Sequence, residues 1–324
     1  MRLLMLLVLL FPVLSFGSDV YKRLFEETQV LAAQGSAVAQ LDLGKKYEIG
    51  MGVSKDQKEA VKWYRLAADQ GYAYAQFLLG KKYDFGIGVP KDDKEAVKWY
   101  RLAADQGLAG AQYNLAWMYG KGEGVPKDQK EAVNWLRLAA DQGDAGAQYN
   151  LGWMYGKGEG VPKDDKEAVK WYRLAADQGD VGAQYNLGVM YDEGRGVPED
   201  VKEALKWYRL AADQGDAKAQ YNLGLMHSNG EGVPKDQKEA VKWYRLAAEQ
   251  GDAEAQGNLG VMYGNGTGVP KDNLLAYMWW NIAGANGQDV EENMGILTDL
   301  MSQDEISKAQ EKTTQYIKDN PGVY

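Results

Sequence analysis

The sequence predicts an all-α protein built from seven stacked helix-turn-helix repeats. The pair Ala-Gln recurs seven times at a constant spacing of 36 residues. Apolar residues form helical stripes within each period, and Gly, Pro and Asp recur where those helices would begin and end. A fixed period of this length is typical of a solenoid, in which every repeat adds to one continuous core. The repeats, numbered 1 to 7 here, are expected at 37–71, 73–107, 109–143, 145–179, 181–215, 217–251 and 253–287.

The first half of repeat 4 illustrates the first helix of each pair. Ala147, Leu151 and Tyr155 recur at intervals of four residues, which places them on one helical stripe. The glycines within 156–160 then interrupt the helix, and Pro162 cannot continue it. We therefore expect a helix up to this loop. Gly152 is expected to let the second helix approach closely, because it has no side chain.

The second half of repeat 4 predicts the second helix. Asp164 and Glu167 have the spacing of a capping box, in which the Asp caps the free helix N–H groups and the Glu reaches back to the N–H of the cap residue. Ala168, Trp171 and Ala175 form the apolar stripe that follows. Gly179 supplies the left-handed position that ends helices. The capping pair recurs at Asp56/Glu59, Asp92/Glu95, Asp128/Glu131, Asp200/Glu203 and Asp236/Glu239, whereas Asp272 is followed by Leu275.

Segments outside the repeats are expected to close the ends of the core. Residues 18–36 resemble an unpaired second helix over 21–34, and residues 288–324 predict two helices over 289–300 and 303–318. The second helix of repeat 7 is more apolar than its equivalents, so we expect it to pack against this C-terminal segment. Both ends therefore carry capping helices.

Composition excludes several classes of function. The 324 residues contain no cysteine and one histidine, His227, which excludes thiolate metal sites, disulfides and a cysteine nucleophile. A net charge of −9 argues against a nucleic-acid partner, which requires a basic surface. No cofactor is expected.

Residues 1–17 predict a secretory signal peptide. Arg2 is followed by an apolar run, and Ser15 and Gly17 place small residues before a cleavage site at Ser18. The run is shorter than the roughly 20 apolar residues that a membrane span needs, so no stable span is expected after cleavage. The mature protein is therefore expected to be exported, to the periplasm or to the exterior.

The repeated string resembles the Sel1-like repeat family, which is related to the tetratricopeptide repeats. The common pattern is A-x-A-Q-Y-N-L-G-x-M-Y, then G-x-G-V-P-K-D, then E-A-x-x-W-Y-R-x-A-A-D-Q-G, and it covers 37–287. The resemblance implies a right-handed α-α superhelix of antiparallel helix pairs. It also implies a non-catalytic adaptor or scaffold for other proteins, in bacteria often in the cell envelope or secreted.

In tetratricopeptide repeats the first helix of each pair lines a concave groove, so the resemblance places a candidate site for a protein or peptide partner there. Aromatic residues bury a large area for little entropy, and asparagines can bond a peptide backbone. Trp117 and Trp153 occupy a position that varies between repeats, which favours a surface. The candidate residues are Tyr113, Asn114, Trp117, Tyr149, Asn150, Trp153, Tyr185, Asn186, Tyr221 and Asn222.

Structural interpretations stand beside these. The asparagines can instead bond the adjacent repeat, and His227 can be a core tyrosine position that has drifted. The tryptophans of the second helices recur in six repeats and are expected in the core: Trp63, Trp99, Trp135, Trp171, Trp207 and Trp243.

An enzyme is the alternative function. Cysteine-rich relatives in the Sel1-like family have been linked to penicillin binding and β-lactam hydrolysis, and a peptidoglycan-associated role belongs to the same alternative. This chain has none of those cysteines and no Ser-x-x-Lys sequence. Its glycine-rich loops lack the order of a phosphate-binding loop, so we interpret them as turns. No catalytic residue and no metal ligand is expected.

Overall fold

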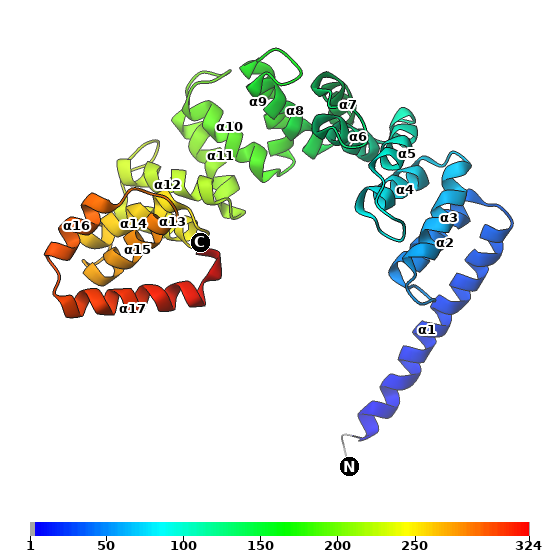
Figure 1. The fold of residues 1–324 in the computed structure, drawn as a ribbon, viewed down its shortest axis with the longest axis horizontal. Coiled ribbons are helices and arrows are strands. Elements are labelled where there is room, and N and C mark those ends of the chain that lie inside the picture. The colour runs from blue at the N-terminus through cyan, green and yellow to red at the C-terminus, as the bar shows by residue number, and fades with distance from the viewer. Residues whose placement is uncertain (1–3, 324) are drawn as a thin grey trace. The chain divides into compact units, whose positions relative to one another are not determined.

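The computed structural model describes residues 4–323, with side chains described from Asp19 onward. It contains seventeen α-helices and one short 3₁₀ helix, and no strand, within these residues. The chain divides into two compact units, an N-terminal unit, Met1–Lys163, and a C-terminal unit, Asp164–Tyr324. In each unit consecutive helices pack side by side, as an all-α solenoid requires (Figure 1).

The helices alternate between the two positions of the repeat. The first helices are α2 (Ala37–Ile49), α4 (Ala73–Phe85), α6 (Ala109–Lys121), α8 (Ala145–Lys157), α10 (Val181–Asp192), α12 (Ala217–Asn229) and α14 (Ala253–Asn265). The second helices are α3 (Gln57–Asp69), α5 (Asp93–Asp105), α7 (Gln129–Asp141), α9 (Asp165–Asp177), α11 (Val201–Asp213), α13 (Gln237–Ala248) and α15 (Asn273–Ala285). The predicted helix pairs are therefore confirmed.

Both ends carry the predicted additional helices. Helix α1 (Leu4–Ala33) precedes the repeats, and α16 (Glu291–Asp299), α17 (Gln303–Asp319) and η1 (Pro321–Val323) follow them. The side chains of the predicted signal peptide, residues 1–17, lie outside the described residues, so its cleavage stays a prediction. Within the part of the chain that the structure describes, no helix is both long and apolar enough to cross a membrane.

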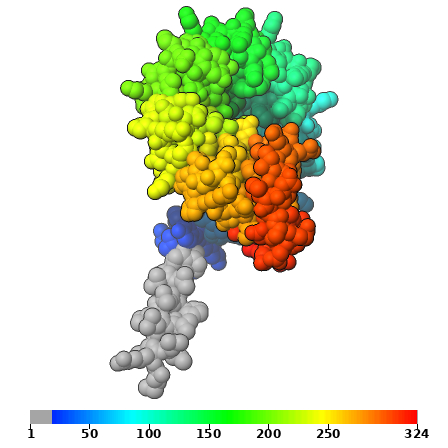
Figure 2. Space-filling view, turned by 90° about the vertical axis from the view of Figure 1, so that its left-hand side faces the viewer, coloured from blue at the N-terminus to red at the C-terminus, as the bar shows by residue number. Residues whose placement is uncertain are grey.

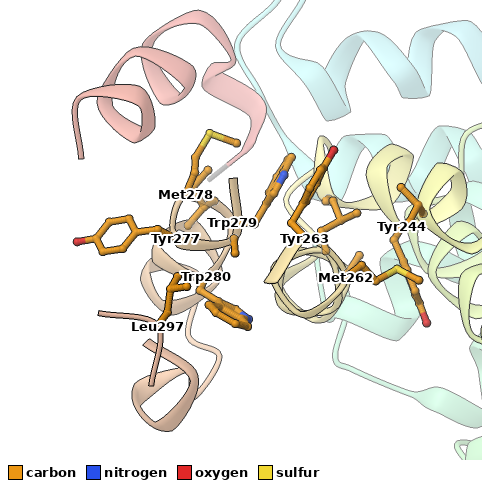
Figure 3. Packing of buried hydrophobic residues seen from close by; sticks show 14 of the residues in the cluster. Tyr244, Met262, Tyr263, Tyr277, Met278, Trp279, Trp280 and Leu297 are labelled. Carbon is orange, nitrogen blue, oxygen red and sulfur yellow. The ribbon is translucent and has the colours of Figure 1, made fainter. Parts of the chain in front are cut away.

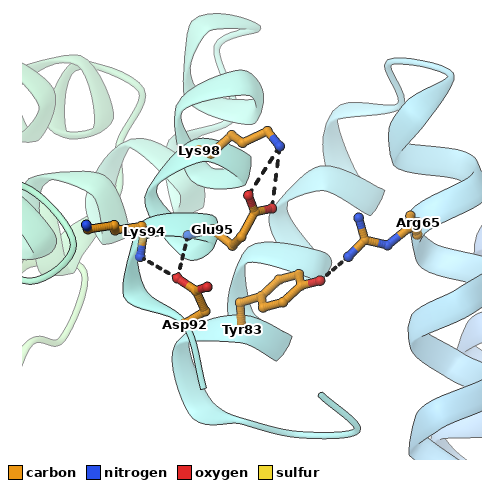
Figure 4. Close-up of polar contacts among 6 residues, drawn as sticks. All are labelled: Arg65, Tyr83, Asp92, Lys94, Glu95 and Lys98. Carbon is orange, nitrogen blue, oxygen red and sulfur yellow. Dashed lines mark hydrogen bonds and ion pairs between the residues drawn. The ribbon is translucent and has the colours of Figure 1, made fainter. Parts of the chain in front are cut away.

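Half of each predicted capping box forms in the second helices. The Asp92 carboxylate accepts from the N–H groups of Lys94 and Glu95 at 3.0 and 3.1 Å (Figure 4). The prediction that Glu95 reaches back to the cap residue is wrong, because the Asp92 N–H donates to the carbonyl of Tyr83 at 3.0 Å and Glu95 pairs with Lys98. The first helix of the same repeat thus supplies the acceptor for the N–H of the cap residue. A complete box forms only at Ser302 and Glu305, among the described helix starts.

Glycines end the helices and shape the loops as predicted. Gly143 follows α7 with φ 91°, and its N–H donates to the carbonyl of Ala140 at 2.9 Å. In the loop after α8, Gly158 and Gly160 have φ of 75° and 71°. A Cβ on Gly160 would lie 2.3 Å from the carbonyl oxygen of Gln129, so this loop packs directly on the backbone of α7. The glycine-rich loops are turns that connect the first helix of a repeat to the second and pack against the preceding repeat.

In repeats 1, 2, 5 and 6 the core has alanine, leucine and glycine on the first helix and a buried tyrosine ring on the second. Ala147 and Leu151 are fully buried, as predicted. Gly80 shows why glycine recurs in the first helices, because a Cβ there would lie 2.6 Å from the ring of Tyr100. Four of the six predicted core tryptophans are buried, and Trp63 and Trp135 are half-buried.

The repeated glutamine connects neighbouring repeats. The Gln76 side chain donates to the carbonyl of Ala68 at 3.1 Å and accepts from the Gln106 side chain at 2.8 Å. The same relay recurs in the C-terminal unit, where Gln184 bonds Ala176 and Gln214. These amides satisfy one another in the core, where an unpaired polar group would be costly. This explains the Ala-Gln pair, whose role the sequence analysis left unassigned.

The C-terminal segment closes the core of repeat 7, as predicted. Trp279 packs edge-on against Tyr316 of α17 at 5.2 Å between ring centroids, and Leu297 of α16 joins the same cluster (Figure 3). The carbonyl of Val323 accepts from Gln256 and Asn286 at 3.1 and 2.7 Å, which ends the amide relay. Figure 2 shows the orange-red C-terminal helices against the orange surface of repeat 7.

The N-terminal cap uses the same interactions. Phe25 and Ala32 of α1 are buried against Ala39 and Leu43 of α2. The Gln40 side chain donates to the carbonyl of Ala32 at 3.2 Å, so α1 takes the place of a preceding second helix.

From repeat 2 onward, a tyrosine near the end of the first helix pairs with an arginine of the preceding repeat, except where His227 replaces the tyrosine. Arg65 donates to the Tyr83 hydroxyl (Figure 4), and the same pair recurs at Arg173 and Tyr191. At His227 the equivalent Arg209 lies over the ring of Trp243, 4.9 Å from its centroid. The His227 ring is buried, and burial lowers its pKa. This supports the interpretation of a core position that has drifted from tyrosine.

Replacing His227 by tyrosine is expected to stabilise the protein and to reduce its acid sensitivity. The new hydroxyl would pair with Arg209, which should raise the free energy of unfolding by about 1 kcal/mol at neutral pH. Because burial lowers the folded-state pKa of His227, the unfolded chain binds the proton first, and stability falls as the pH drops below about 6.5. Glu239 and Asp236 oppose this shift, and Lys242 and Arg209 reinforce it. Urea unfolding from pH 8 to pH 5 should give a shallower loss for the variant. The same loss of unfolding free energy between pH 8 and pH 5 in both proteins would contradict this explanation.

Candidate functional site

The ten candidate residues all lie on first helices, divided between the two units. Six lie in the N-terminal unit, on α6 and α8, and four in the C-terminal unit, on α10 and α12.

The candidate tyrosines are half-buried, and three of them pack against neighbouring helices. The rings of Tyr185 and Tyr221 contact Tyr208 and Tyr244 of the second helices, at centroid distances of 6.0 and 5.9 Å. A Cβ on Gly146 would lie 3.4 Å from the ring of Tyr113, so this ring packs against the next first helix.

Three of the candidate asparagines bond tyrosines of adjacent helices. The Asn114 side chain hydrogen-bonds that of Tyr100, and Asn222 that of Tyr208. Asn150 donates instead to the Tyr113 hydroxyl at 3.1 Å. The interpretation that these asparagines bond the neighbouring repeat is therefore supported at all three positions, whereas contact with a ligand stays a prediction.

Trp117 and Trp153 are exposed, as the sequence predicts. Trp117 exposes 51% of its surface and Trp153 37%, whereas the core Trp99 exposes 4%. The Lys121 ammonium lies 4.7 Å above the ring of Trp117. Because exposed tryptophan is costly in water and tryptophan is enriched at binding hot spots, these two rings are the strongest candidates for a binding surface. We call Tyr113, Trp117, Tyr149 and Trp153 the aromatic face.

A hollow of about 410 Å³ lies at the aromatic face, within the N-terminal unit. This volume is in the range of ligand-binding clefts, about 300–1,000 Å³. Apart from the aromatic face, it is lined by apolar Ala116, Ala132, Leu136 and Met154, and by Gly120, Lys121, Lys127, Gln129, Asn150 and Glu159. Five residues that line the hollow are among the candidates predicted from the sequence: Tyr113, Trp117, Tyr149, Asn150 and Trp153. The other lining residues were not predicted. The signal that could have found the hollow is that Ala116 and Leu136 replace the glycine and tyrosine of the common pattern.

The titratable groups of the core have structural roles. Burial, followed by the charge of Asp84, raises the pKa of Tyr100 far above its usual value, and burial raises the pKa of Tyr244 to about 12. Burial would raise the pKa of Glu48, but hydrogen bonds from Lys82 and Tyr64 lower it below its usual value. These groups keep one protonation state near neutral pH. Among the described residues, no group of three or more acidic or histidine side chains could hold a metal ion.

Comparison with known families identifies the repeat. The Sel1 repeat model matches seven consecutive segments, 37–72, 73–108, 109–144, 145–180, 181–216, 217–252 and 253–288. The chain belongs to the Sel1 repeat family. Its members generally act as scaffolds for protein interaction.

Two solved structures are similar to this Sel1 repeat protein. A Sel1 repeat protein from Oxalobacter formigenes is 36% identical, with a TM-score of 0.69 over 88% of this chain and 82% of that one. The protein c5321 of Escherichia coli, described as a protective antigen of uropathogenic strains with an SLR fold, is 28% identical, with a TM-score of 0.54 over 92% and 96%. A comparison with curated proteins found no match.

Proposed function

We propose that this Sel1 repeat protein is a non-catalytic scaffold that binds a protein or peptide partner through its first helices, above all at the aromatic face. The observation that carries the proposal is the exposure of Trp117 and Trp153 beside a hollow, whereas four of the six recurring tryptophans of the second helices are buried in the core and the other two are half-buried. Under this proposal the first-helix face is the concave groove that the tetratricopeptide resemblance implies.

We further propose that the protein acts outside the cytoplasm, in the periplasm or at the exterior. The support is the predicted signal peptide, residues 1–17. Mass spectrometry of the protein from envelope and culture fractions should show a mature chain that begins at Ser18. Recovery of the unprocessed chain in the cytoplasm would contradict this.

The double variant Trp117→Ala, Trp153→Ala tests the binding proposal. Because large exposed aromatics dominate binding energy, we expect partner affinity to fall by at least about tenfold. The melting temperature and helical circular dichroism should stay near those of the wild type, since neither ring is in the core.

The matched control is Leu102→Ala, Leu138→Ala, which truncates two side chains that are 41% and 48% exposed on second helices of the same unit. This control should bind the partner like the wild type. Unchanged binding in the tryptophan variant, or its unfolding, would overturn the proposed site.

A further inference from the structure

Repeat 3 departs from the packing rule of the other repeats at two positions. In repeats 1, 2, 5, 6 and 7 a glycine of the first helix lies against an aromatic ring of the second, as at Gly80 and Tyr100, or Gly188 and Tyr208. A Cβ at either glycine would lie 2.6 Å from that ring. In repeat 3 the glycine is replaced by Ala116, and the tyrosine by Leu136. Ala116 is compatible with Leu136 but not with a tyrosine at that position, because the alanine methyl would collide with the tyrosine ring.

Part of the environment that a tyrosine would occupy is nevertheless kept in repeat 3, namely the aromatic ring and the asparagine, whereas the acceptor Asp84 is replaced by glycine. In repeat 2 the Tyr100 ring packs on Phe77 at 6.1 Å, its hydroxyl donates to Asp84 at 3.0 Å, and Asn114 bonds it from the next first helix. The equivalent positions in repeats 3 and 4 are Tyr113, Gly120 and Asn150.

These three residues line the 410 Å³ hollow together with Ala116 and Leu136. The hollow is therefore the place of the missing tyrosine ring, enlarged because Gly120 has no side chain. Asn150, which lacks this tyrosine as a partner, donates to the Tyr113 hydroxyl instead.

We propose that this hollow is a subsite for one aromatic side chain of the partner, inserted where the other repeats place their own tyrosine. The inference rests on the proposed function and specifies its partner as an extended peptide with an aromatic anchor. Trp117 and Trp153 flank the inserted ring, and the alanine and leucine side chains contact it. Burial of a ring between aromatic side chains is favourable beyond its area alone.

The charges around the subsite specify the residues beside the anchor. Lys121 and Lys127 line it against one carboxylate, Glu159, and Lys157 lies one helical turn beyond Trp153. This local excess of positive charge stands out in a chain of net charge −9. The partner segment therefore carries acidic residues next to its aromatic anchor, because complementary charge selects the partner and its register.

A peptide titration followed at the Met154 methyl group tests the subsite. Met154 lines the hollow and is 4% exposed, whereas Met118 does not line it, so ¹³C-methyl methionine gives a reporter and an internal reference. The probes are acetyl-Asp-Asp-Phe-Asp-Asp-amide, the same peptide with Ala for Phe, and the same peptide with Lys for Asp. We expect a saturable Met154 shift with the first, and affinities at least tenfold lower for the other two.

The decisive variant is Ala116→Gly, Leu136→Tyr, which fills the hollow with the pair that the other repeats use. This variant should fold like the wild type and bind the phenylalanine peptide at least tenfold more weakly. Leu138→Ala, outside the hollow, should bind it unchanged. Equal binding of the phenylalanine and alanine peptides, or full binding by the filled variant, would overturn the subsite. A stronger Met154 shift with soluble disaccharide-peptide fragments of peptidoglycan would also overturn it, in favour of a sugar site.

The outcomes separate this inference from the proposed function. If the filled variant keeps the natural partner and the Trp117/Trp153 variant loses it, the subsite is wrong and the scaffold proposal stands. If both variants keep the partner, both proposals fail.

Discussion

Replacing Gly160 by alanine is expected to lower the free energy of unfolding by about 2–5 kcal/mol. Its φ of 71° is unfavourable for a residue with a Cβ, and that Cβ would lie 2.3 Å from the Gln129 carbonyl oxygen. The clashing atom belongs to the backbone, so no side-chain rotation relieves it. The loop after α8 would have to separate from α7. Urea unfolding of the full chain, followed by circular dichroism, measures the change.

Gly143→Ala is the matched control for Gly160→Ala. Gly143 has a similarly positive φ of 91°, but nothing lies within 4 Å of a Cβ placed there. Its replacement should therefore lower the free energy of unfolding by only about 1–2 kcal/mol, the cost of placing a residue with a Cβ in the left-handed conformation. Equal losses for the two variants would show that the close approach to Gln129 does not contribute to stability.

Replacing Leu151 by alanine is expected to cost about 2–5 kcal/mol, through lost burial and a residual cavity. Leu151 lies on the apolar stripe of α8 and is fully buried. Leu138→Ala truncates the same side chain where it is 48% exposed, so that variant should stay within about 0.5 kcal/mol of the wild type. A loss below 1 kcal/mol for Leu151→Ala would contradict the assignment of this stripe to the core.

The repeat pattern predicts most of the fold because each signal is local. The spacing of Ala147 and Leu151 identifies a helical stripe, and Asp92 and Gly143 mark a helix start and a helix end within a few residues of chain. The partner of Glu95 could not be predicted in this way. The Asp92 N–H donates to the carbonyl of Tyr83 in the preceding helix and therefore does not bond Glu95. This contact depends on the path of the loop between the two helices.

The candidate site is predicted less completely, because its shape depends on contacts between repeats. The variability at Trp117 and Trp153 predicts their exposure. The hollow beside them depends on Ala116 and Leu136, which belong to different helices and are conspicuous only once the glycine–tyrosine contact is known. For the same reason the glutamine relay was not predicted, since each amide bonds a residue 30 positions away.

Site-specific photo-crosslinking tests most directly whether the aromatic face is the recognition surface. A photoreactive phenylalanine at Lys121, beside Trp117, is compared in cells with the same group at Leu138, which is also exposed and lies on the second helix of that repeat. The account predicts a discrete adduct from position 121, lost when Trp153 is replaced by alanine, and none from position 138. An adduct from position 138 alone, or no adduct from position 121, would contradict it.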